Sequence, residues 1–448
     1  MESIDVFFKP KCICLIGASD KAGSVGNAIS QNLSRYTGKV FFTNPRLAGK
    51  TLYGRKVYSS IKDIKEDIDL AVIATPATVC PMVVQEISET NCKNIVMITS
   101  GFSESGREDL TESIKRLISK NNIRLIGPNC LGLLNLNNGL DCTFNSREKY
   151  DLPKQGKVSI ITQSGALGLA LLDLASKEQL HLSKFVSYGN AIDIDESVLL
   201  DYFACDKATD VILCYIEGVR DGRRFFSALK NASKTKKVLV LKGGVTNNGK
   251  SAVKSHTAAI AGSSKVFSTA IRQAGAIQVS TIREMFNLAK FFSFYPRDKF
   301  DGIQIITNGG GFGVLTTDQL ELYGIRLTKP TETTISKIKR LVPEYATVGN
   351  PIDLTGDADN KRFVDVINAC VKDRNTQGIA VLLLLQLPGL SSGISSEIAK
   401  IKKSTDKPIF VLTIGGEKTE AQIKEFERNK VLCLRDPRDA VEVLKNLH

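Results

Sequence analysis

The sequence predicts an α/β protein made of three consecutive doubly wound domains, each built on a parallel sheet. A short apolar strand, a glycine-rich turn and a helical stretch occur in that order three times, at 11–26, 158–168 and 303–313. Apolar strands that alternate with helices are typical of parallel sheets covered on both faces. Polar stretches with prolines, 145–156 and 293–302, separate the three parts. We therefore expect domains at 1–146, 150–294 and 298–448.

The remaining strands are expected where continuous apolar runs are bounded by polar or turn residues. In the first domain these runs are 40–43, 70–75, 95–99 and 123–126. In the second domain they are 185–187, 211–216 and 238–241. In the third domain they are 379–385, 409–414 and 431–434.

The composition is that of a folded protein, with 42% hydrophobic and 24% charged residues in a chain of 448. No apolar run approaches the roughly 20 residues that a membrane span needs. Residues 1–11 lack the basic and apolar regions of a secretory signal, so we expect a cytoplasmic protein that does not bind a membrane. The ten cysteines are scattered without a CxxC pair. This pattern predicts buried reduced thiols and no metal site.

The formal net charge of +13 is compatible with nucleic acid, an acidic surface or an anionic small ligand. The chain has no dense block of lysine and arginine, no zinc-finger spacing, few aromatic residues and no tryptophan. These absences disfavour nucleic acid as a ligand. An anionic small molecule therefore fits the charge better.

The first glycine turn indicates a phosphate site. It runs Gly17, Ala18, Ser19 and on to Val25 and Gly26, between a strand and a helix, where backbone N–H groups can approach a phosphate. Ser19 stands where the dinucleotide fingerprint has its second glycine. A tight turn without a ligand is the alternative interpretation.

The second strand ends with Asn44 and Arg46 instead of the acidic residue that an NAD site uses. This ending favours a phosphorylated ribose, as in coenzyme A or NADP. Because ligands sit at the carboxyl ends of parallel strands, we expect the loops after the other strands to line the same crevice. The residues concerned are Thr75, Pro76, Ser100, Gly101, Asn129 and Cys130.

Of the three histidines, His256 is the one in a chemically suggestive setting, a segment of small residues that we expect to be a loop. His181 lies in a helix-to-strand connection and His448 is the last residue. Glu217 ends an apolar strand, where active sites of this architecture form. A carboxylate beside an imidazole fixes its tautomer and orients the second nitrogen as a nucleophile. From its own segment alone, His256 could equally be a structural loop residue.

Two helix starts offer N–H groups and a helix dipole to an anion. The first comprises Gln163, Ser164, Gly165 and Ala166. The second comprises Asn308, Gly309 and Gly310. We expect one or both to hold phosphate.

Eight motifs in order show a resemblance to the nucleoside-diphosphate-forming acyl-CoA synthetases, the superfamily that includes succinyl-CoA synthetase. The resemblance is greatest to the alpha subunits of ADP-forming acetyl-CoA synthetases, and it covers roughly 8–439. The motifs lie at 16–19, 127–132, 163–168, 187–190, 215–218, 255–257, 307–310 and 350–356.

The resemblance implies a Rossmann-like CoA-binding domain followed by two flavodoxin-like domains. It implies that phosphate converts acyl-CoA to an acyl phosphate, that His256 takes the phosphoryl group with the support of Glu217, and that ADP then becomes ATP. The family's nucleotide site is an ATP-grasp domain, and no segment of this chain resembles one. We therefore expect an ATP-grasp beta subunit in an α2β2 heterotetramer, with Mg²⁺ accompanying ADP or ATP on that partner.

The chain departs from the family pattern at two positions. Ala258 replaces a glycine after the histidine, and Phe312 replaces a residue that is often proline. If the first position needs a positive φ, alanine strains it. Two other functions stay open from the sequence. They are a non-catalytic sensor of CoA or acyl-CoA, and an NADP-dependent oxidoreductase, which the incomplete glycine fingerprint disfavours.

Overall fold

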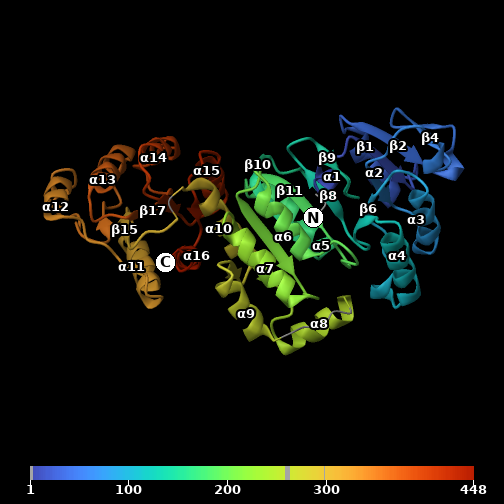
Figure 1. Cartoon of the computed structure of the whole chain (residues 1–448). Coiled ribbons are helices and arrows are strands. Elements are labelled where there is room, and N and C mark those ends of the chain that lie inside the picture. The colour runs from blue at the N-terminus through green and yellow to red at the C-terminus, as the bar shows by residue number, and fades with distance from the viewer. Residues whose placement is uncertain (1–3, 258–262, 297, 448) are drawn as a thin grey trace. The chain divides into compact units, whose positions relative to one another are not determined.

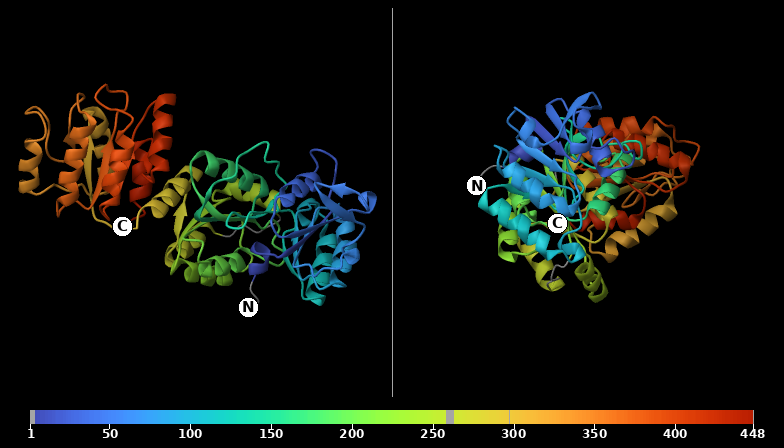
Figure 2. Two further views of the ribbon diagram at one scale, coloured as in Figure 1. Left: turned by 90° about the horizontal axis from the view of Figure 1, so that it is seen from above. Right: turned by 90° about the vertical axis from the view of Figure 1, so that its right-hand side faces the viewer.

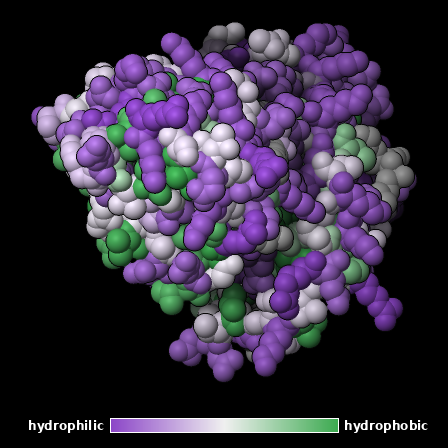
Figure 3. Space-filling model, turned by 90° about the vertical axis from the view of Figure 1, so that its left-hand side faces the viewer, coloured by the Kyte–Doolittle hydropathy of each residue, from purple (hydrophilic) through white to green (hydrophobic). Residues whose placement is uncertain are grey.

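The computed structural model describes residues 4–257, 263–296 and 298–447, with the side chains of 254–257 left out (Figure 1). The chain packs as two compact units, Met1–Thr281 and Ile282–His448. None of the helices in these ranges is long and apolar enough to cross a membrane. Figure 3 shows one face of the molecule, on which hydrophobic residues stand scattered in a mostly hydrophilic surface.

The first sheet of unit 1 has the strand order β3-β4-β2-β1-β5-β6-β7. From β4 to β7 this is the Rossmann order, and only β3 pairs antiparallel to its neighbour. Helix α2 packs on one face of the sheet, and α3 and α4 on the other. The strands are β1 (Cys12–Ile16), β2 (Lys39–Thr43), β3 (Thr51–Leu52), β4 (Arg55–Tyr58), β5 (Leu70–Ile73), β6 (Asn94–Met97) and β7 (Arg124–Ile126). The helices are α1 (Asp5–Phe8), α2 (Val25–Ser34), α3 (Cys80–Ser88) and α4 (Glu108–Lys120), with short 3-10 turns η1 (Pro45–Leu47), η2 (Ile61–Asp63), η3 (Ala77–Val79) and η4 (Ser103–Ser105).

The second sheet of unit 1 has the order β14-β13-β12-β10-β11-β8-β9. Its parallel part, β10 to β14, has the flavodoxin order 2-1-3-4-5. Strands β8 and β9 come from the segment that precedes residue 146, yet β8 pairs antiparallel to β11. The strands are β8 (Gly132–Asn135), β9 (Leu140–Asp141), β10 (Gln155–Thr162), β11 (Leu182–Ser187), β12 (Val211–Ile216), β13 (Lys237–Lys242) and β14 (Ile277–Val279). The helices are α5 (Gly165–Lys177), α6 (Glu196–Cys205), α7 (Gly222–Ser233), α8 (Asn247–Thr257) and α9 (Ser264–Gln273).

Unit 2 holds one sheet of the order β16-β15-β17-β18-β19, again 2-1-3-4-5, with helices on both sides of the strands (Figure 2). Helix α10 packs against α16 of the same unit, and its buried Lys290 pairs with Glu427 at 2.7 Å. The strands are β15 (Ile303–Thr307), β16 (Ile352–Asp353), β17 (Gly378–Leu382), β18 (Ile409–Leu412) and β19 (Cys433–Leu434). The helices are α10 (Ile282–Phe294), α11 (Gly310–Leu322), α12 (Glu332–Lys339), α13 (Asn360–Lys372), α14 (Ile394–Lys403), α15 (Glu417–Arg428) and α16 (Pro437–Leu444).

The predicted fold class is confirmed: three α/β sheets follow one another, a Rossmann order and then two flavodoxin orders. The first two sheets are mixed at their edges, a detail that the apolar runs did not predict. The domain limits at 146 and 294 stay a prediction.

Candidate active site

The sheet order places Gln163 and Glu217 at a point where the strand order reverses, which is where ligands bind in open α/β sheets. In the second sheet this point lies between β10 and β12. Gln163 follows β10, and its side-chain carbonyl accepts hydrogen bonds from the backbone N–H groups of Glu217 at 2.8 Å and Gly218 at 3.1 Å. Glu217, at the end of β12, is buried. Gln163 thus holds the strand end that carries this carboxylate.

The N-terminus of α5 has the features of an anion cradle. Ser164 is the N-cap, and its hydroxyl accepts from the N–H of Leu167. Among the described residues, no group accepts a hydrogen bond from the N–H of Gly165 or Ala166. These two groups lie at the positive end of a helix of 13 residues.

A cavity of about 560 Å³ brings this cradle together with the strand ends of the first sheet. Ten of the residues predicted from the sequence line it: Val25, Thr75, Pro76, Ser100, Asn129, Cys130, Gln163, Ser164, Gly165 and Ala166. The predicted crevice of one sheet and the predicted phosphate cradle of the next therefore form one site. Burial raises the pKa of the Cys130 thiol to about 12, so this cysteine is a neutral part of the wall.

The loop after β11 closes the cavity against the loop after β7. The N–H of Asn190 donates to the carbonyl of Pro128 at 2.9 Å. Gly189 has φ +55, and a Cβ atom there would collide with the carbonyl oxygens of Pro128 and Asn129. Only glycine allows this close approach. Both Gly189 and Asn190 line the cavity and were missing from our predicted site, although they belong to a motif that carried the resemblance.

Asn190 also connects this loop to the first sheet. Its amide donates to Glu104 Oε2 at 2.6 Å and accepts from the Asn129 amide at 3.2 Å. Glu104 Oε1 in turn accepts from the N–H of Gly101 at 2.6 Å. Burial alone would raise the pKa of Glu104, but the hydrogen bonds from Asn190 and the backbone lower it. An ionised Glu104 therefore holds the two loops together.

The first glycine turn lies at the carboxyl ends of β1 and β2. Gly17 has φ +99, and a Cβ atom there would stand 2.6 Å from the carbonyl oxygen of Ala74. The Asn44 amide donates to the Ala18 carbonyl at 2.7 Å, and Arg46 is exposed. Seven of the residues predicted around the first sheet do not line the cavity. They are Gly17, Ala18, Ser19, Gly26, Asn44, Arg46 and Gly101.

His256 lies in the last turn of α8, so the small-residue segment that we expected to be a loop is helical as far as Thr257. Small residues such as Ser and Ala are compatible with a helix as well as with a loop, which explains the difference. The side chain of His256, and the whole of Ala258 and His448, lie outside the described residues. Helix α8 contacts η4, whose Glu104 holds the loops around the cavity.

The second predicted cradle lies in unit 2. The Asn308 side chain is engaged by the backbone of Leu384, from whose N–H it accepts at 2.9 Å. A Cβ atom on Gly310 would stand 2.8 Å from Asp353 Oδ2. A carboxylate at this helix N-terminus competes with any other anion there. Phe312 is buried in α11.

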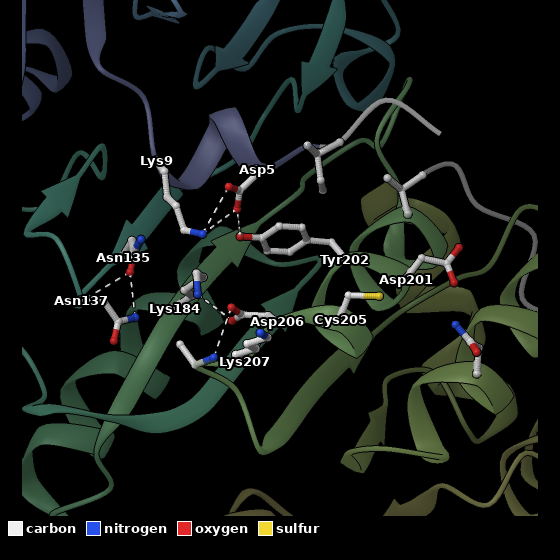
Figure 4. Close-up of a pocket in the computed structure, with 14 residues that line it drawn as sticks. Asp5, Lys9, Asn135, Asn137, Lys184, Asp201, Tyr202, Cys205, Asp206 and Lys207 are labelled. Atoms are coloured by element: carbon white, nitrogen blue, oxygen red, sulfur yellow. Dashed lines mark hydrogen bonds and ion pairs between the residues drawn. The ribbon is translucent and has the colours of Figure 1, made fainter.

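A larger cavity of about 710 Å³ lies at the opposite, amino end of the second sheet (Figure 4). Tyr202, which donates to Asp5 at 3.0 Å, and the buried pair of Lys184 and Asp206 at 2.6 Å help to line it. None of the predicted site residues lines this cavity. In the described part of the chain, no cluster of three or more His, Cys, Asp or Glu residues could hold a metal ion.

Comparisons with known proteins agree with this geometry. Three family models match in order: a CoA binding domain at 11–135, a succinyl-CoA ligase like flavodoxin domain at 155–292 and a ligase-CoA domain at 303–429. A solved structure of the acetyl-coenzyme A synthetase 1 of Ca. Korarchaeum cryptofilum, in complex with phosphate and ADP, superposes with a TM-score of 0.93. That match is 33% identical and covers 100% of this chain and 96% of the other.

Two sequence relatives bear related names. The ADP-forming acetate–CoA ligase of Methanocaldococcus jannaschii is 39% identical over 443 residues, which are 98% of this chain and 62% of the relative. The chain thus spans less than two thirds of that protein. Subunit alpha of the ADP-forming acetate–CoA ligase I of Pyrococcus furiosus is 36% identical, over 100% of this chain and 97% of the relative. From this agreement along its whole length, the chain belongs to the family of the ADP-forming acetate–CoA ligases.

Proposed function

We propose that the chain is the CoA-binding, phosphohistidine-carrying alpha subunit of an ADP-forming acyl-CoA synthetase that acts on acetyl-CoA. The observation that carries this proposal is the single cavity in which the strand ends of the Rossmann sheet meet the N-terminus of α5. A thioester held by the first sheet and a phosphate held by α5 would be neighbours there. We keep 1–146, 150–294 and 298–448 as domain limits, a division that the ranges of the three family models support.

In the proposed site, the phosphates and adenosine of CoA bind at the turn from Gly17 to Gly26 and at Asn44 and Arg46, which follow the second strand. The pantetheine arm then follows Thr75, Ser100 and Asn129 into the cavity. The exposed guanidinium of Arg46 supplies positive charge at the edge of the site. The cradle of α5 lines the cavity, so we assign phosphate to Gln163–Ala166.

The proposed chemistry has three steps. A phosphate oxygen attacks the thioester carbon, the C–S bond breaks, and the CoA thiolate takes the proton that the phosphate gives up. An imidazole nitrogen of His256 then attacks the phosphorus of the acyl phosphate, the P–O bond to the acyl group breaks, and the carboxylate leaves. Glu217 stabilises the positive charge that the imidazole gains. Finally the phosphoryl group passes to ADP, which gives ATP.

The nucleotide step belongs to another polypeptide in this proposal. We expect an ATP-grasp beta subunit, an α2β2 assembly and Mg²⁺ bound with ADP or ATP on that partner, all in the cytoplasm. The name of the P. furiosus relative, a subunit alpha of similar length, supports a chain that works with a second subunit. The M. jannaschii relative, which is longer than this chain, supports an additional part as well.

A coupled assay tests the proposal. The chain, purified with the ATP-grasp protein of its own organism, should release CoA from acetyl-CoA in repeated turnovers only when both phosphate and ADP are present, and should form ATP in equal amount; with phosphate alone, release should stop at about one CoA per His256. His256→Ala should abolish ATP formation, and His181→Ala should not. Hydrolysis of acetyl-CoA in repeated turnovers without ADP or phosphate, or ATP formation by the His256 variant, would refute the proposed function.

A further inference from the structure

Lys242, the last residue of β13, lies at the junction between Glu217 and the segment that carries His256. Its ammonium donates to the backbone carbonyl of Glu217 at 2.7 Å and also to the carbonyl of Gly243. It stands 5.5 Å from the centre of the Phe267 ring, which stacks on Phe225. One side chain therefore contacts the end of β12, the chain that leads into α8, and α9.

The packing around Lys242 is close. A Cβ atom on Gly243 would stand 2.8 Å from the Tyr215 hydroxyl and 3.4 Å from Cγ of Glu217. A Cβ atom on Gly244 would stand 2.8 Å from Val253, which lies on α8 three residues before His256. The two glycines thus let the segment between β13 and α8 pack against the end of β12 at Gly243 and against α8 at Gly244.

A hydrogen bond also joins the segment before α8 to the start of α9. The Ser264 hydroxyl, at the start of α9, donates to the carbonyl of Val245 at 2.6 Å. Residues 246–257, the described segment that leads to His256 and is here termed the His256 arm, therefore begin at a point that this bond ties to α9, the helix whose Phe267 faces Lys242. Burial lowers the pKa of Lys242, although the Glu217 carboxylate opposes this change. The ammonium is thus held at a desolvated position by the groups it bonds.

We propose that Lys242 is a positioning residue for phosphoryl transfer, which sets the base of the His256 arm against the backbone of Glu217. This inference rests on the proposed function, because it needs His256 as the phosphoryl acceptor and Glu217 as its support. Lys242 itself does not line the cavity, so it should act on the transfer step and not on CoA binding. A misplacement of about 1 Å at a reacting group lowers rates on the order of 10²-fold.

The chain offers a matched control at the other end of the same strand. Lys236, which directly precedes β13, also donates to two backbone carbonyls, those of Asp206 at 2.8 Å and Thr209 at 2.5 Å. Lys236→Met and Lys242→Met each remove an ammonium that donates to two backbone carbonyls, at opposite ends of β13. Lys242→Arg keeps hydrogen-bond donors at this position. If Lys242→Met does not fold, Lys242→Gln takes its place, because glutamine keeps a donor on a shorter side chain.

The test is the single-turnover rate at which the full complex with the ATP-grasp subunit transfers ³²P from labelled phosphate to His256 in the presence of acetyl-CoA. We expect Lys242→Met to slow labelling on the order of 10²-fold at an unchanged affinity for CoA. Lys242→Arg should recover most of the labelling rate, and the rate of Lys242→Gln should fall between those of Lys242→Met and Lys242→Arg. Lys236→Met should be labelled at the wild-type rate. The inference would be overturned if Lys242→Met or Lys242→Gln were labelled at the wild-type rate. It would also be overturned if Lys236→Met lost as much labelling rate as Lys242→Met, or if Lys242→Arg recovered none of it. Absence of label in the wild type would instead refute the proposed function.

Discussion

Glu217 is held through its backbone N–H and its backbone carbonyl. Gln163 accepts from its N–H, and Lys242 donates to its carbonyl. Burial, followed by the Glu217 carboxylate, raises the pKa of the neighbouring Tyr215 to about 12, so the phenol stays neutral beside the acid. A substitution that changes only the carboxylate therefore leaves the local backbone in place.

The Glu217→Gln variant should fold and bind CoA like the wild type but transfer phosphate on the order of 10²-fold more slowly. The physical reason is that a neutral amide cannot stabilise the charge that develops on the imidazole. Steady-state ATP formation and CoA affinity, measured on the same preparation, check this prediction. Asp210→Asn is the control, because Asp210 directly precedes the same strand at its opposite end and forms an exposed pair with Lys157. An unchanged turnover for Glu217→Gln would make this carboxylate structural.

At the scale of elements, the start of α5 is the part of the cavity built for an anion. Ser164 satisfies one backbone N–H, and those of Gly165 and Ala166 face no acceptor among the described residues. Ser, Asn and Asp are all good N-caps. The charge of this position can therefore be changed while the helix start is kept.

The Ser164→Asp variant should raise the KM for phosphate strongly, by about tenfold or more, because a carboxylate near the bound anion repels it. Ser164→Asn has the same shape without the charge, so its KM for phosphate should stay much closer to that of the wild type. Initial rates at varied phosphate and saturating acetyl-CoA provide the measurement. If aspartate and asparagine raise the KM equally, size and not charge governs the position.

Individual strands and loops show which parts of the fold could be predicted from the sequence. The end of β12 at Ile216 was predicted, because an apolar run followed by Glu and Gly marks a strand end locally. Strand β8 was not predicted as part of the second sheet, because four buried residues say nothing about which sheet will pair with them. The cavity residue Gly189 was missed for a similar reason: its role depends on a loop 60 residues away in the chain. A strand end and its neighbouring residues can therefore be predicted from the local sequence, whereas contacts between segments far apart in the chain cannot.

At the scale of the whole chain, the proposal predicts that CoA stabilises the free protein. A ligand that binds only the folded state adds about 2.7 kcal/mol at a concentration of 100 times Kd. The melting temperature of unit 1 should therefore rise with CoA, and NADPH should have little effect because its nicotinamide half has no place in a site built for a thioester. A shift with NADPH and none with millimolar CoA would contradict the assignment of the first sheet.

The central claim is that His256 carries the phosphoryl group, and mapping of the label tests it most directly. The chain alone should not be labelled by γ-³²P-ATP, since the nucleotide site is proposed to lie on the partner. With the ATP-grasp subunit added, it should gain one acid-labile, base-stable label, and peptide sequencing should place it on His256. A label on any other residue, or an undiminished label in the His256→Ala variant, would contradict the mechanism even though the fold stands.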